Sequence, residues 1–135
     1  MADQTPYEIM GGADSVRALV DRFYDLIEHE PRFASLRAMH EADLSAIRTS
    51  LAAFLAGWLG GPRDWFGQGK CVMSLHGALA IDPGLARQWA DAMSQAIMEH
   101  PGLDERFREQ MSEALTRVAN AMINRAQAPA ETAAA

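Results

Sequence analysis

The segment RALVDRFYDLI, residues 17–27, decides the fold class. Together with the turn before it, it places an apolar residue at every third or fourth position: Val16, Leu19, Val20, Phe23 and Ile27. This period gathers apolar side chains on one stripe of an α-helix, whereas a half-buried strand needs strict alternation. We therefore expect an amphipathic helix with its stripe in the core and with Asp14 or Ser15 as its N-terminal cap.

The same helical period recurs in three further segments. The first, residues 44–58, stops before Gly60-Gly61-Pro62, where glycine permits left-handed backbone and proline cannot continue a helix. The second opens at Asp82-Pro83, a capping residue followed by proline at the first helical position, and stops at His100. The third covers residues 107–123. Strand-like alternation is nowhere sustained in the sequence, so the expected fold class is all-α.

The composition is that of an ordinary globular protein. Of 135 residues, 49% are apolar and 22% charged, which suits one domain, expected over residues 1–125. The alanine-rich residues 126–135 have little to bury and are expected to form a disordered tail. A net charge of −6 argues against a nucleic-acid partner. Neither a membrane-length apolar run nor a secretory signal is seen, so we expect a cytoplasmic protein without membrane contact. A monomer or a homodimer is expected, and the sequence does not distinguish them.

The segment between Gly60 and Pro83 is long and weakly patterned, and it includes WFGQGKCVMSLHG at residues 65–77. Such connections inside a compact domain are usually functional or ordered by something else, and a cofactor could order this one. Its single cysteine, Cys71, cannot form an internal disulfide and is interpreted as a small buried residue rather than a redox centre.

The histidines differ in their surroundings. His29 lies between two glutamates and His100 at a helix end, so both are expected on the surface. His76 has apolar neighbours, and from the residues alone it is either a satisfied core or loop residue or a metal ligand. Common hydrolase and zinc-site motifs are absent from the sequence. A heme site needs less, since one imidazole on an apolar wall suffices to fix the iron.

Five motifs in order resemble the group II truncated hemoglobins from Tyr7 to Arg125: YEIMGG, RALVDRFYDLI, LAAFLAGWLGGP, His76 and QWADAM. The resemblance implies an abbreviated globin fold, a two-on-two helical sandwich around heme b, with His76 as the proximal iron ligand. It also implies that Gly11-Gly12 separates a short first helix from the second, and that Gly60-Gly61 ends the distal helix.

The resemblance assigns roles on the opposite, distal face of the heme. Tyr24 matches the distal tyrosine that donates a hydrogen bond to the iron ligand, and Trp89 matches the tryptophan whose indole N–H points to the same ligand. His40 matches a position where relatives carry tyrosine or histidine, and it is a third candidate donor. Leu51 and Phe54 match apolar residues that roof the heme. Tyr7 and Trp58 are interpreted as packing residues, and Trp65 as a packing or heme-edge residue.

This chain also departs from the family pattern. Many relatives carry RHxPF around the proximal histidine, whereas this chain reads KCVMSLHGAL, with Ala78 and Leu79 in place of proline and phenylalanine. Arg63 and Lys70 are the local cations left to pair with heme propionates. Ile47 stands where relatives commonly have a small or polar residue, which predicts a narrower direct path for the ligand.

Three functions follow as hypotheses. The first is reversible binding of O2, and of CO and NO, for storage, delivery or sensing. The second is a heme enzyme, with peroxidase-like turnover or NO dioxygenation supported by a reductase partner, because hydrogen bonds that retain O2 tightly suit redox chemistry better than transport. The third is a helical interaction module that has lost heme, suggested by the unusual sequence around His76.

Overall fold

The computed structural model describes residues 4–62 and 81–123. The predicted tail at residues 126–135 lies outside the described residues. The regular elements within them are all helical: α1 (Pro6–Met10), α2 (Ala13–His29), the 3-10 helix η1 (Pro31–Phe33), α3 (Ala34–Ala38), α4 (Ser45–Trp58), α7 (Pro83–Glu99) and α8 (Glu105–Ala121). The all-α prediction is confirmed, and in this described part of the chain no helix is both long and apolar enough to span a bilayer.

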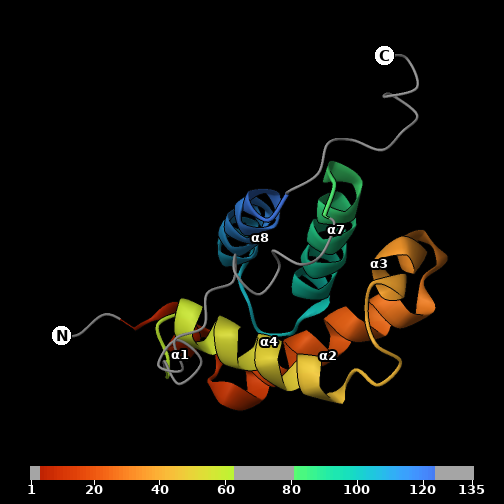
Figure 1. Cartoon of the computed structure of the whole chain (residues 1–135). Coiled ribbons are helices and arrows are strands. Elements are labelled where there is room, and N and C mark those ends of the chain that lie inside the picture. The colour runs from red at the N-terminus through yellow and green to blue at the C-terminus, as the bar shows by residue number, and fades with distance from the viewer. Residues whose placement is uncertain (1–3, 63–80, 124–135) are drawn as a thin grey trace.

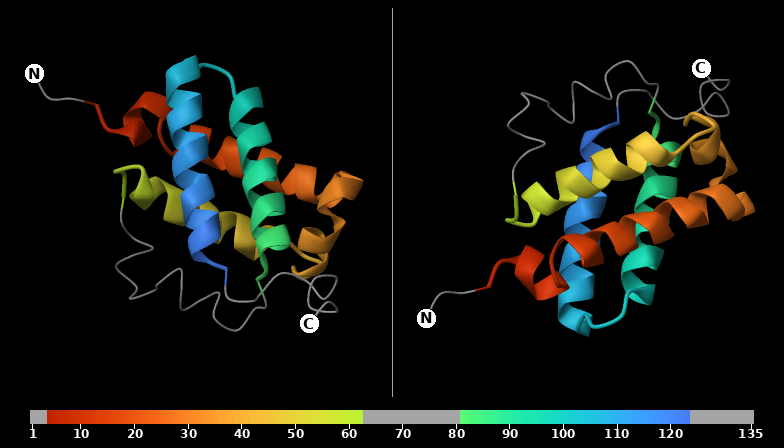
Figure 2. Two further views of the ribbon diagram at one scale, coloured as in Figure 1. Left: turned by 90° about the horizontal axis from the view of Figure 1, so that it is seen from above. Right: turned by 90° about the horizontal axis from the view of Figure 1, so that it is seen from below.

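The four longest described helices form two crossed pairs. α2 lies beside α4, and α7 lies beside α8, with the second pair stacked across the first (Figures 1 and 2). This is the expected two-on-two arrangement. The four segments predicted from the apolar period correspond to these helices, and Asp82 caps α7 as predicted, with its carboxylate accepting from the Leu85 N–H at 2.9 Å.

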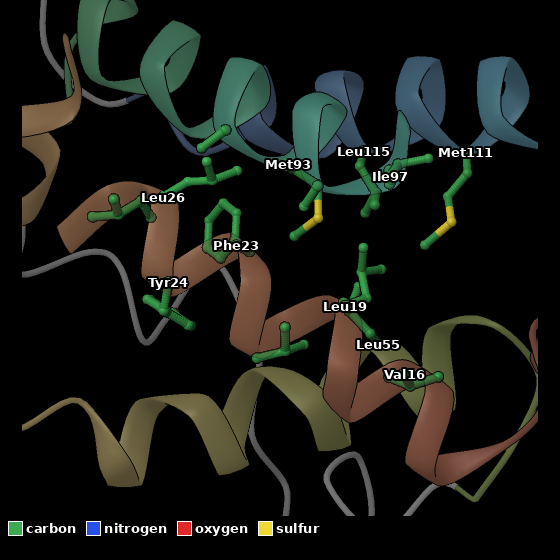
Figure 3. Close-up of a cluster of buried hydrophobic side chains, with 14 of the residues drawn as sticks. Val16, Leu19, Phe23, Tyr24, Leu26, Leu55, Met93, Ile97, Met111 and Leu115 are labelled. Atoms are coloured by element: carbon green, nitrogen blue, oxygen red, sulfur yellow. The ribbon is translucent and has the colours of Figure 1, made fainter. Parts of the chain in front are cut away.

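The core lies where the pairs cross. Figure 3 shows apolar side chains of α2 facing those of the α7–α8 layer, and the following are at most 1% exposed: Leu19, Phe23, Met93, Ile97 and Leu115. Full burial of one such side chain contributes about 1.5–3 kcal/mol relative to leaving it in water. The predicted stripe of residues 16–27 is therefore the surface that joins the two layers.

The start of α2 differs from the prediction. Its N-cap is Gly12 and no side chain caps it, so the prediction of Asp14 or Ser15 as the cap is wrong. Both residues already lie inside the first turn. Gly11 and Gly12 have φ angles of 108° and 86°, a region that glycine adopts without strain, and they reverse the chain between α1 and α2 as the resemblance implied.

Ser15 is used instead to connect two layers. Its hydroxyl lies 2.7 Å from Nε2 of His100, the C-cap residue of α7, and the His100 carbonyl accepts from Arg108 Nη2 at 2.6 Å. His100 is 8% exposed, so the prediction of a surface position is wrong for it, while His29 is exposed as expected. Burial, with a smaller effect from the Arg108 charge, lowers the pKa of His100.

α1 is docked on the end of α4. The Tyr7 N–H donates to the Leu59 carbonyl at 3.0 Å, and a Cβ added to Gly61 would lie 2.6 Å from the Tyr7 ring. The missing side chain at Gly61 is therefore what admits the ring. Tyr7 and Trp58 both pack against the core, as predicted.

We predict that Gly61→Ala destabilises the protein by about 1–3 kcal/mol, the usual range for overpacking, because the new methyl group clashes with the Tyr7 ring. The same change in a Tyr7→Ala background should have a much smaller effect, because the ring is gone. The measurement is urea denaturation of the wild type, both single variants and the double variant. Additive losses of unfolding free energy would contradict this contact.

The buried His100 predicts an acid-sensitive contribution to stability. Because its pKa is lowered in the folded state, the unfolded chain takes up the proton first, and stability is lost as pH falls below the unfolded value of about 6.5. The contribution of His100 to stability is fully lost once the pH is below its pKa in the folded state. His100→Asn should therefore reduce the fall in unfolding free energy between about pH 8 and pH 5, whereas His29→Ala should leave it unchanged. Equal pH profiles for wild type and His100→Asn would be inconsistent with a buried neutral imidazole.

Candidate functional site

Three aromatic side chains with polar tips gather beside the core: Tyr24 from α2, His40 from the turn after α3, and Trp89 from α7. The rings of Tyr24 and His40 meet edge to face, with centroids 5.7 Å apart. The Phe23 ring contacts both Tyr24 and Trp89. Its centroid lies 4.8 Å from that of Tyr24 and 5.2 Å from that of Trp89. The structure thus brings together the three residues predicted on the distal side, and Phe23 spaces them.

Tyr24 is buried, with 3% of its surface exposed, and it lies on the side of α2 nearer to α4 (Figure 3). Burial raises the pKa of its phenol well above the usual value, and the positive charge of Arg48 only partly opposes that rise. The hydroxyl therefore stays protonated across the physiological range. A buried phenol of this kind can donate a hydrogen bond in surroundings that screen it weakly.

His40 is held by the helix that precedes it, α3. Its Nδ1 lies 2.9 Å from the Leu36 carbonyl oxygen, and because a carbonyl only accepts, Nδ1 must carry the hydrogen. In the neutral imidazole Nε2 is then an acceptor, and it becomes a donor only when the ring is protonated. The expected role of His40 as a third donor therefore requires the imidazolium form.

A side chain of α7 supports this turn. The Leu36 N–H donates to Gln88 Oε1 at 3.1 Å, so one residue of α3 connects Gln88 to His40. Gln88 is the neighbour of Trp89 in the sequence. This hydrogen-bond chain therefore ties the His40 ring, through the Leu36 backbone, to a side chain of α7. Sequence reasoning missed Gln88, and its place beside Trp89 was the available signal.

α4 supplies an apolar face. Phe54 is 8% exposed and belongs to the core, while Leu51 is half-buried and packs against it. Ile47, one turn before Leu51, is 38% exposed. Residues 47, 51 and 54 lie on one side of a helix by their spacing. An apolar face on the helix that packs against α2, which carries the buried Tyr24 phenol, can hold an apolar molecule that presents a small polar end to that donor.

Arg48 is the second residue that sequence reasoning missed. It donates hydrogen bonds to Asp21 and Asp25 of α2, on either side of Tyr24 in the sequence. The available signal was a lone cation between the apolar residues of 44–58, matched by two carboxylates four positions apart in 17–27.

The other predicted site residues lie outside the described residues, in the chain between α4 and α7. They are the predicted iron ligand His76, the cations Arg63 and Lys70, and the residues Cys71 and Trp65.

Comparisons with known proteins agree with this geometry. Residues 5–124 match the family model described as bacterial-like globin. The group 2 truncated hemoglobin YjbI of Bacillus subtilis is 30% identical over 125 residues, 91% of each chain. The group II 2-on-2 hemoglobin of Agrobacterium tumefaciens superposes with a TM-score of 0.86 at 32% identity, over 92% of this chain and 97% of that one. The cold-adapted truncated hemoglobin of Pseudoalteromonas haloplanktis also gives 0.86, at 31% identity over 90% of this chain and 99% of its own. With its helical sandwich and its match to these relatives along almost the whole chain, the protein belongs to the bacterial-like globins, as a truncated hemoglobin of group II.

Proposed function

We propose that this truncated hemoglobin binds O2 reversibly, and also CO and NO, at a heme b iron ligated by His76. Heme-based gas binding is the general property of its family. The observation that carries the finer proposal is the buried Tyr24 phenol, 3% exposed and with a raised pKa, in one cluster with His40 and Trp89. Phenylalanine would fill the core equally well, whereas a phenol that stays protonated can also donate a hydrogen bond to a bound ligand.

The residues of this chain suit heme. His76 would ligate the iron, Leu51 and Phe54 would cover an apolar part of the macrocycle, and Arg63 and Lys70 would pair with the propionates. The side chains are chemically appropriate for this site. Apolar residues would keep water from the heme surface, while the phenol and the indole could donate hydrogen bonds to one small polar ligand.

When bound, heme would supply a ferrous iron as the site for a diatomic gas, and the outer atom of a ligand such as O2 would accept hydrogen bonds from the protein. Tyr24 and Trp89 would each donate to that atom, through the phenol O–H and the indole N–H. The hydrogen bonds gain strength from the dry surroundings of the pocket. His40, whose Nδ1 is committed to Leu36, would add a donor only after protonation.

A heme enzyme remains the second candidate, favoured by the presence of two side chains with hydrogen-bond donors, Tyr24 and Trp89, in contact with the same Phe23 ring. Two hydrogen bonds would slow O2 release, which suits peroxidase-like turnover or NO dioxygenation better than delivery. A slow O2 dissociation rate together with turnover sustained by a cellular reductase would favour the enzyme. Family membership argues against a module without heme, and a Soret band in the purified protein would exclude that third hypothesis.

We predict that His76→Gly loses heme, or retains it only when imidazole is supplied, because one imidazole fixes the iron. His29→Ala is the matched control, since the His29 side chain is 73% exposed and should leave the spectrum unchanged. The measurement is the absorbance spectrum of the purified ferrous proteins. An unchanged ferrous spectrum for His76→Gly would remove His76 as the ligand.

We further predict that Tyr24→Phe or Trp89→Phe speeds O2 release by up to about ten- to a hundredfold, since a hydrogen bond to a charged acceptor contributes roughly 1.5–3 kcal/mol. Water can replace one lost donor, so the double variant should exceed the product of the single effects. Stopped-flow dissociation of O2 measures this, with CO release as a control because CO accepts hydrogen bonds weakly. Rates within about threefold for all four proteins would mean that neither residue contacts the ligand.

A further inference from the structure

The charged contacts of Arg48 hold α4 to the part of α2 that carries Tyr24. Arg48 Nη1 donates to the Asp21 carboxylate at 3.0 Å and to the Asp21 backbone carbonyl at 3.1 Å. Nη2 donates to the Asp25 carboxylate at 2.9 Å. The guanidinium carbon lies 5.8 Å from the centroid of the Tyr24 ring.

The spacing of three residues on α2 explains how these contacts can affect Tyr24. Asp21, Tyr24 and Asp25 are three and four residues apart, so they are neighbours on one face of the helix. A planar guanidinium that bonds both carboxylates and a backbone carbonyl restricts how that face can rotate or slide against α4. On α4, Arg48 lies three residues before Leu51 of the apolar face.

We propose that Arg48 is a positioning residue, which sets where the Tyr24 hydroxyl meets the gas ligand. The proposal rests on the proposed role of Tyr24 as a ligand donor. Most exposed ion pairs contribute little to the stability of a fold. The Arg48 side chain, however, is only 17% exposed, and it makes its hydrogen bonds to α2 from a neighbouring helix. Its positive charge also acts on the Tyr24 phenol directly, opposing the effect of burial on the pKa.

Arg17 provides a matched control. It pairs with the same carboxylate, Nε to Asp21 Oδ1 at 3.1 Å, but its side chain is 44% exposed and its hydrogen bond to α4 is longer, from Nη1 to Thr49 Oγ1 at 3.3 Å. Removing Arg17 therefore takes one cation from Asp21 without removing the Arg48 contacts with Asp25 and the backbone.

The experiment compares the wild type with Arg48→Met, Arg48→Lys and Arg17→Met, each with and without Tyr24→Phe. The first readout is the C–O stretching band of the ferrous CO complex, which responds to a nearby hydrogen-bond donor. The second is O2 dissociation by stopped flow. Thermal unfolding is recorded for every protein. If Arg48→Met does not fold, both readouts are taken from Arg48→Lys, which keeps the charge but not the planar guanidinium.

We expect Arg48→Met to shift or split the C–O band towards that of Tyr24→Phe and to speed O2 release by about three- to tenfold, a coupling typical of residues in contact. Arg48→Lys should show part of this change and Arg17→Met none. In the Tyr24→Phe background, Arg48→Met should have no further effect on either readout.

Two results would overturn the inference in different ways. If Tyr24→Phe changes both readouts and neither Arg48 variant does, or if Arg48→Met acts equally without the phenol, Arg48 does not position Tyr24 while the proposed function stands. If Tyr24→Phe itself matches the wild type, the donor role of Tyr24 fails, and the inference about Arg48 fails with it.

Discussion

The edge-to-face contacts of the Phe23 ring connect the candidate site to the hydrophobic core. Its ring is fully buried and touches the rings of Tyr24 and Trp89, from the same helix and from the opposite layer. Consecutive helix residues point about 100° apart, so Phe23 can enter the layer of α7 and α8 while Tyr24 faces the side of α4. The packing that stabilises the crossed pairs therefore also fixes the separation of the two proposed donors.

Around this aromatic centre, polar contacts orient the groups that would act on a ligand. The Leu36 backbone joins Gln88 to His40, and Arg48 joins α4 to α2 beside Tyr24. Burial keeps the phenol protonated, so its hydrogen remains available for donation. These contacts come from α2, α3, α4 and α7, so four helices contribute to holding the Tyr24 and His40 side chains in place.

Much of the fold could be predicted from local chemistry. The apolar period of residues 16–27 predicted the buried stripe of α2, and Asp82-Pro83 predicted where α7 begins. The N-cap prediction failed because α2 begins directly after Gly12, which puts Ser15 inside the first turn; the Ser15 hydroxyl instead meets His100, 85 residues away, a contact that no local pattern contains. The same holds for His100, whose burial depends on packing between layers. Periodicity alone did not select Tyr24, His40 and Trp89. Their roles came from family resemblance, whereas Arg48 and Gln88 emerged only from the three-dimensional contacts.

The central claim, that exchangeable donors of Tyr24 and Trp89 act directly on the gas ligand, is tested most directly by resonance Raman spectroscopy of the ferrous O2 complex in H2O and in D2O. A hydrogen bond from either residue makes the iron–dioxygen stretching frequency sensitive to deuteration. The account predicts an isotope shift in the wild type that disappears when both residues are replaced by phenylalanine. A wild-type frequency that is the same in both solvents would contradict it.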